Sequence, residues 1–188
     1  MELTQAQIET LLSGRCIADV HPWSTGDART VEGFYKFVCA TVERRARVLS
    51  RIVWNHYGSG YASYIDAWFY KATPDFEVEG GVAPRGAGMG VVVLFSRLSP
   101  YFVLMEGTKS LDARDGSRDL PDSDLIDKFS RHCVAELAAQ IQAILESVGL
   151  VRLFARDLEA PLGRTVKVPT VLTVRAFFAF DALFYWED

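Results

Sequence analysis

With 188 residues, 49% hydrophobic side chains and a net charge of −4, the chain can bury one sizeable core, and its composition excludes an intrinsically disordered protein. The acidic balance disfavours general binding to nucleic acid phosphates. No apolar run approaches the roughly 20 residues of a membrane-spanning helix, and the amino terminus lacks the basic start and apolar core of a secretory signal. We therefore expect a single domain over residues 1–188, located in the cytoplasm.

Two helices are predicted in the first third of the chain. Gln5 to Leu12 suits a short opening helix, which a loop around Pro22 and Gly26 follows. Over Thr30 to Tyr57, apolar residues recur at steps of three and four, which is typical of one buried helical face. Glycines at 58 and 60 suit the end of that helix. The apolar face consists of Val31, Tyr35, Val38, Val42, Ala46, Leu49 and Val53.

The pattern changes to that of strands between residues 61 and 106. Tyr61 to Lys71 is rich in aromatic residues, which favour strands, and Asp75 to Glu79 alternates polar and apolar residues. Val91 to Arg97 and Tyr101 to Glu106 flank a short turn, as two antiparallel strands would. Together these segments predict a meander of up to four strands.

A second long helix is predicted to begin at Asp122-Ser123-Asp124, since these side chains can accept the free first-turn N–H groups. Gly149 suits a left-handed position after its last turn. Its apolar stripe would be Ile126, Phe129, Cys133, Leu137, Ile141, Ile144 and Val148. Val166 to Phe180 then predicts one or two further strands.

The order of these elements has no alternation of strand and helix. It indicates an α+β fold, with a mostly antiparallel sheet of about four to six strands packed against two long helices.

Motifs for cofactors and metals are weak. Phosphate-binding loops follow a strand and open a helix, whereas the glycines from Gly86 to Gly90 precede a strand. The three histidines are far apart, so we expect His21 and His132 to pack at a boundary or in a loop. Cys16, Cys39 and Cys133 are odd in number, which favours buried thiols. We predict no cofactor and no metal.

Carboxylates on neighbouring strands are a further candidate, because glycosidic chemistry uses such a pair. The residues are Asp66, Glu77, Glu79 and Glu106. Exposed strand faces explain them more simply.

Charge between residues 112 and 127 is the most informative feature. Six aspartates stand against Arg114 and Arg118, so the segment has a net charge of −4. Asp112, Asp115 and Asp119, with Arg114 among them, lie on a predicted loop long enough to meet a partner. We therefore predict a non-enzymatic binding or inhibitory protein with a basic protein partner. A bacterial immunity protein that neutralises a cationic toxin is one form.

Two alternatives belong to other classes. A small-molecule enzyme or sensor would have a pocket lined by aromatic side chains, namely Tyr61, Tyr64, Trp68, Tyr70 and Tyr101. The aromatic residues from Phe177 to Trp186 suit either core or a homodimer contact, and we favour core.

The other alternative is RNA processing. Arg44, Arg47 and Arg51 would share one side of the predicted helix. The spacing of Arg51 and His56 resembles the ribonuclease motif of the HEPN families, which implies metal-free cleavage with an arginine stabilising the phosphate and a histidine moving the proton. On a helix these two residues lie about 140° apart, so they would not share one face.

Overall fold

The computed structural model describes residues 3–54, 61–78, 87–110, 122–163, 166–169 and 176–187. Its main helices are α1 (Gln5–Leu12), α2 (Ala28–Ala46) and α3 (His132–Ser147), with the short helices α4 (Ala155–Leu158) and α5 (Ala179–Leu183). Its strands are β1 (Leu49–Val53), β2 (Tyr61–Ala62), β3 (Tyr64–Tyr70), β4 (Ala87–Ser96), β5 (Tyr101–Ser110), β6 (Val151–Arg152) and β7 (Trp186–Glu187). Single 3-10 turns lie at η1 (Trp23–Thr25), η3 (Pro74–Phe76) and η4 (Ser123–Leu125).

A five-stranded sheet in the order β1-β3-β4-β5-β6 forms the centre of the fold. Its pairings are antiparallel except for the short parallel contact of β5 with β6. β2 and β7 form a separate antiparallel pair. The predicted α+β class with a mostly antiparallel sheet is therefore confirmed.

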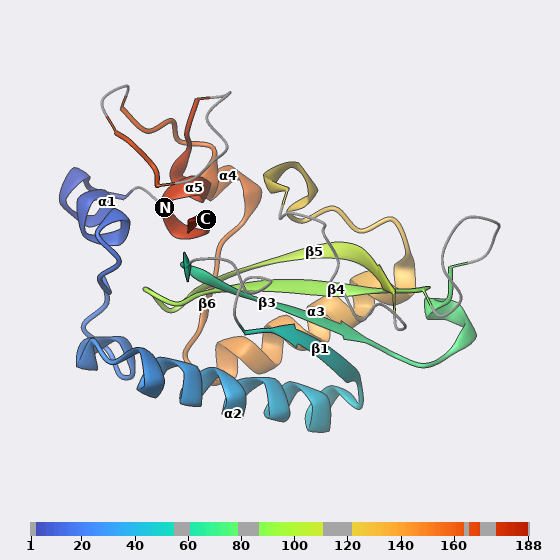
Figure 1. The fold of residues 1–188 in the computed structure, drawn as a ribbon. Helices are drawn as coiled ribbons and strands as arrows, with labels where there is room; N and C mark the ends of the chain where they lie inside the picture. The colour runs from blue at the N-terminus through green and yellow to red at the C-terminus, as the bar shows by residue number, and fades with distance from the viewer. Residues whose placement is uncertain are drawn as a thin grey trace.

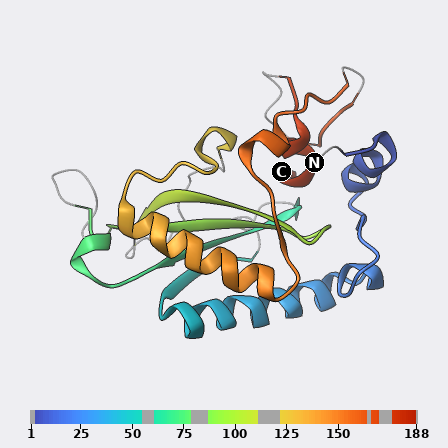
Figure 2. The same ribbon diagram turned by 180° about the vertical axis from the view of Figure 1, so that it is seen from behind.

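Helices cover both faces of this sheet (Figures 1 and 2). The long helices α2 and α3 lie against one face, and α1, α4 and α5 gather on the other. Alternate residues of a strand point to opposite faces, so β3 supplies both cores: Phe69 packs on the α2 and α3 side, and Trp68 on the α5 side. No helix in the described ranges is long and apolar enough to cross a membrane.

The first long helix is shorter than its periodicity predicts. α2 ends at Ala46, and Arg47 adopts a left-handed conformation with φ of 53°. Leu49 then starts β1, which pairs with β3 along its whole length. A stretch rich in β-branched residues can fit the spacing of a helix or that of a strand. Pairing with a neighbouring strand outweighs its weak helical preference.

The second long helix starts ten residues later than predicted. The Asp122 carboxylate does accept a backbone N–H, from Asp124 at 2.8 Å, but this caps η4 and not a long helix. Asp127 then turns the chain with φ of 64°, and α3 begins at His132. Gly149, with φ of 88°, follows the end of α3 as predicted.

Two predicted strands are also wrong in their described parts. Pro74–Phe76 forms η3, after which only Glu77 makes an isolated bridge, to Gly88. Residues 166–169 and 176–177 form no strand, and Phe178 makes one isolated bridge before α5 begins. The carboxyl-terminal aromatic residues from Phe180 onwards belong to the core, whereas Phe177 and Phe178 are only partly buried.

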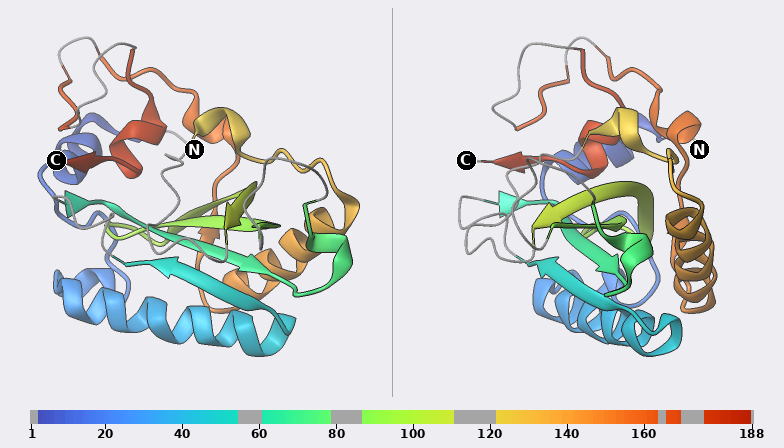
Figure 3. Two further views of the ribbon diagram at one scale, coloured as in Figure 1. Left: turned by 45° about the vertical axis from the view of Figure 1, so that its right-hand side comes forward. Right: turned by 90° about the vertical axis from the view of Figure 1, so that its right-hand side faces the viewer.

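Glycines allow the open end of the β4–β5 hairpin, where β4 starts and β5 ends, to curl over the sheet (Figure 3, right). A Cβ atom at Gly90 would lie 2.4 Å from the Phe69 carbonyl oxygen and 2.6 Å from Trp68 Nε1. The Trp68 indole occupies the inside of the curl and donates to the Gly107 carbonyl at 3.1 Å. This curl carries Lys109, near the end of β5, over the middle of β3.

Candidate partner-binding surface

A cavity lies beside the predicted loop that carries Asp112, Asp115 and Asp119. Lys109 precedes this loop and Asp122 follows it, and both line the cavity, which has a volume of about 300 Å³ and lies on the α5 side of the sheet. Val92, Leu94 and Met105 form its apolar wall. We call it the Asp66 cavity, after the carboxylate on β3 that lies inside it.

A buried ion pair lies in this cavity. Lys109 Nζ donates to both carboxylate oxygens of Asp66, at 2.7 and 2.6 Å, and each side chain is more than nine-tenths buried. This ion pair joins the curled end of β5 to β3. Either charge alone would be strongly unfavourable at this buried position, so each side chain needs the other. The prediction that Asp66 lies on an exposed strand face is therefore wrong. Lys109 was missed because no sequence periodicity relates the two positions.

Glu106, also on β5, binds the residues that precede α3. Its carboxylate accepts the backbone N–H groups of Ser130 at 3.0 Å and of Arg131 at 3.1 Å, together with the Ser130 hydroxyl. Negative charge near the amino terminus of a helix is favourable. Glu106 thus stabilises the connection from η4 to α3 and contributes a negative charge to the Asp66 cavity.

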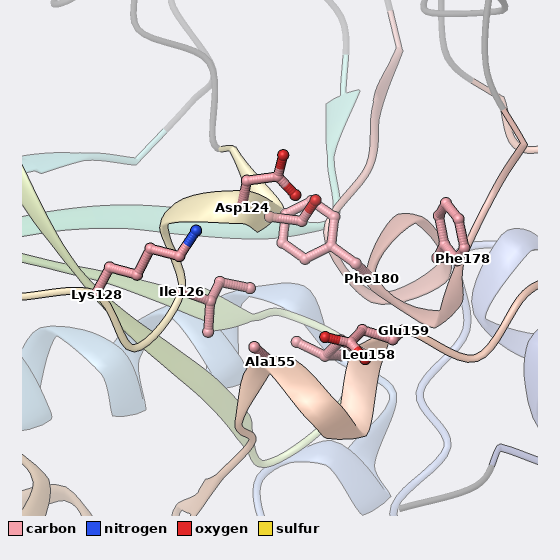
Figure 4. Close-up of a pocket in the computed structure, with 9 residues that line it drawn as sticks. Asp124, Ile126, Lys128, Ala155, Leu158, Glu159, Phe178 and Phe180 are labelled. Carbon is pink, nitrogen blue, oxygen red and sulfur yellow. The ribbon is translucent and has the colours of Figure 1, made fainter.

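A second cavity, of about 220 Å³, lies on the other side of η4. Figure 4 shows Lys128 and Phe178 at opposite sides of it, with Phe180 between them. Asp124 and Glu159, both exposed, add two carboxylates to its lining. We call it the Phe180 cavity.

The turn η4 therefore separates two cavities with a shared excess of negative charge. Their described lining residues include five carboxylates and two lysines, which gives −3. Leu125 projects from the turn with 46% of its surface exposed. We call these residues the η4 surface: Asp66, Glu106, Lys109, Asp122, Asp124, Leu125, Lys128, Glu159 and Phe178. Asp127 lines neither cavity and is not part of this surface; its carboxylate is bound by Arg152 at 2.7 Å and by the Ala155 N–H at 2.8 Å.

The predicted partner residues Asp112, Asp115, Asp119 and Arg114 lie outside the described residues. The described chain on both sides of them reaches the η4 surface, through Lys109 and Asp122.

Of the five predicted pocket residues, Tyr61 alone lines one of the cavities described in this part of the chain. Tyr64 and Trp68 are buried in the core, and Trp68 stacks on Tyr70 with ring centroids 4.2 Å apart. Tyr101 packs at the edge of the same core. Tyr61 lines a cavity of about 320 Å³, which none of the other four shares.

The RNA-processing residues are not arranged as predicted. Arg44 is on α2, Arg47 turns the chain after it, and Arg51 lies on β1, so they do not share one helical side. His56 lies outside the described residues. The HEPN families are all-helical, whereas this fold has a central sheet.

The remaining histidines and cysteines have ordinary environments. His21 is exposed, and His132 is exposed and bonded to Glu136 at 3.2 Å, so neither packs as expected. All three cysteines are free, with Cys39 buried and the other two partly buried. Within the described ranges no three His, Cys, Asp or Glu side chains are grouped so as to hold a metal ion.

Comparison with protein-family models, curated proteins and solved structures found no match to this chain.

Proposed function

We propose that this chain is a non-enzymatic binding protein that holds a basic protein partner on the η4 surface. The observation that carries the proposal is the net charge of −3 around two cavities beside the exposed Leu125. Complementary charge speeds the encounter of two proteins and selects the partner, and an apolar residue among the charges slows dissociation.

The sequence next to the η4 surface also favours a basic partner. Asp112, Asp115 and Asp119 belong to the segment that joins Lys109 to Asp122, and they add negative charge to the sequence next to this surface. A protein that neutralises a cationic toxin, as bacterial immunity proteins do, would need this chemistry.

The first experiment is affinity capture from a lysate of the native host at low and moderate salt. The baits are the parent chain, a triple variant of the η4 surface and a control. The triple variant is Asp122→Asn, Asp124→Asn and Glu159→Gln, three exposed residues whose amide forms keep their shape. Asn also retains the capping oxygen that Asp122 gives to η4. The control is Asp19→Asn, an exposed aspartate outside both cavities.

We expect the parent chain and the control to retain the same basic protein from the lysate. The triple variant should not retain it. Its association rate with the triple variant should fall about tenfold, with a weaker dependence on salt. Capture of no protein at low salt, or equal rates for the triple variant and the control, would contradict the proposal.

A further inference from the structure

A third cavity, of about 320 Å³, lies away from the η4 surface and shares no lining residue with its two cavities. It is enclosed by the loop after α1, the start of α2, strand β2 and the turn between β4 and β5. Its charged lining residues are Arg97 and Glu32, and Tyr61 and Cys16 are among its polar ones. We call it the Arg97 cavity.

Arg97 is held firmly in this cavity. Its Nε donates to the Tyr64 carbonyl at 3.3 Å, its Nη2 donates to the Trp54 carbonyl, and its backbone N–H donates to the Ser63 carbonyl at 2.7 Å. The two side-chain bonds fix the guanidinium, but carbonyl oxygens do not neutralise its charge.

Within the described part of the chain, no carboxylate lies within ion-pair distance of Arg97. The carboxylate that also lines the cavity, Glu32, is paired with Lys36 at 2.7 Å. Arg97 is also the only cation among the described lining residues. A partly buried guanidinium without a counter-ion is unfavourable, and an anion in the cavity would relieve that cost.

The Tyr61 hydroxyl and the Cys16 thiol beside Arg97 stay protonated, so they suit hydrogen-bond donation and not nucleophilic chemistry. Burial raises the pKa of Tyr61 to about 12, with Arg97 opposing the shift, so its phenol keeps its proton at neutral pH. Burial also raises the pKa of the Cys16 thiol, which keeps it un-ionised. Burial lowers the pKa of Arg97, because desolvation disfavours its charged form.

We infer that the Arg97 cavity binds a small monocarboxylate with a short apolar body. The planar guanidinium matches the two oxygens of a carboxylate, and the Tyr61 hydroxyl can donate a further hydrogen bond. Val31, Ala62 and Leu98 would contact the apolar body. A second negative charge would face Glu32 without a second cation, which disfavours a dianion such as phosphate.

The size of the ligand follows from the cavity. Its volume is at the lower end of the range for small-molecule sites, about 300–1,000 Å³. Compounds of the size of isovalerate or benzoate are therefore suitable probes. This site is independent of the proposed partner surface, and either one can fail without the other.

The test is an NMR titration of the ¹⁵N-labelled chain with isovalerate and benzoate. The uncharged controls are isovaleramide and benzamide, and inorganic phosphate is the dianion control. We expect the two carboxylates to shift the Arg97 Nε–H signal and the amides of Gly26 and Leu98, with no such shifts from the amide compounds and weaker ones from phosphate. Equal binding of the amide compounds, or stronger binding of phosphate, would overturn the inference.

Variants make the test independent of folding. Arg97→Gln should weaken benzoate binding at least tenfold and Tyr61→Phe about threefold, whereas Arg44→Gln, an exposed arginine elsewhere, should leave it unchanged. Glu32→Gln should strengthen binding about threefold, because it removes the charge that repels the ligand and loses only a partly exposed helical ion pair and a longer-range attraction to Arg97. Loss of binding in Glu32→Gln would contradict the proposed role of Arg97, and a misfolded Arg97 variant would not affect that comparison.

Discussion

At the scale of single residues, the Asp66 and Lys109 pair is the most consequential interaction of the η4 surface. Both side chains are buried and each is the other's counter-ion. Removing one partner leaves a charge inside the protein, whereas removing both leaves none.

We therefore predict that Lys109→Met lowers the free energy of unfolding by about 3–5 kcal/mol. The double variant Asp66→Leu with Lys109→Met should lose much less than the sum of the two single variants. Urea unfolding followed by circular dichroism measures all three. Additive losses would show that the two side chains do not stabilise each other.

Buried thiol and phenol groups give the protein a predictable alkaline limit. Burial raises the pKa of Cys39 from 9.0 to about 12, with the Glu43 carboxylate adding to the shift. In the unfolded chain this thiol loses its proton near pH 9, while the folded protein keeps it. The stabilisation is therefore complete below pH 9 and is lost as pH rises towards 12.

Between pH 8 and pH 11, Cys39 alone should lower the free energy of unfolding by about 2–3 kcal/mol. Cys39→Ala should flatten this decline by the same amount. Chemical unfolding at a series of pH values tests the prediction, and parallel curves for the parent and variant would refute it. Tyr61 adds to the decline in both proteins, so it does not affect the difference.

At the scale of elements, the glycines of the β4–β5 hairpin determine whether the curl can form. Gly90→Ala should destabilise the fold by about 2 kcal/mol or more, because its Cβ would clash with the Phe69 carbonyl and the Trp68 ring. A Cβ at Gly33, on α2, would meet no atom within 4 Å beyond the backbone of its own helix and its chain neighbours. Gly33→Ala should instead stabilise by up to about 1 kcal/mol. Thermal unfolding of the two variants should therefore shift in opposite directions.

The predictable elements were those whose local signals agree with their tertiary contacts. α1 matches its predicted bounds, and the β4–β5 hairpin follows from two apolar runs around a short turn. The end of α2 could not be predicted, because Leu49 and Val53 continue a helical period while β3 offers them strand pairing. Similarly, the Asp122 cap is a correct local signal that serves only a single 3-10 turn.

For the candidate site, only the sign of its net charge was predictable from the sequence. The excess of aspartates indicated an acidic surface, but its cavities depend on contacts between distant strands. Asp66 and Lys109 are 43 positions apart in the sequence, and only the curl of the hairpin brings them together. Arg97 has no sequence signal that separates it from a surface residue in a turn, because its cavity is formed by distant segments.

At the scale of the whole molecule, one sheet serves two cores. Ile65 and Phe69 of β3 pack towards α2 and α3, whereas Tyr64 and Trp68 pack towards α5. Loss of either helical layer would expose one face of the sheet to water. The η4 surface and the Arg97 cavity are thus supported by the same sheet, although they use different side chains.

The central position of β4 has a consequence for the motions of the protein. β4 is bonded to a neighbour on both edges, whereas β1, among the described strands, has a paired neighbour on one edge only. Amide hydrogens of Val91 to Phe95 should therefore exchange with deuterium only through global opening, and those of β1 through smaller fluctuations. Hydrogen–deuterium exchange should show protection that is greatest in β4 and at least tenfold lower in β1. Equal protection of the two strands would mean that the sheet opens as one unit.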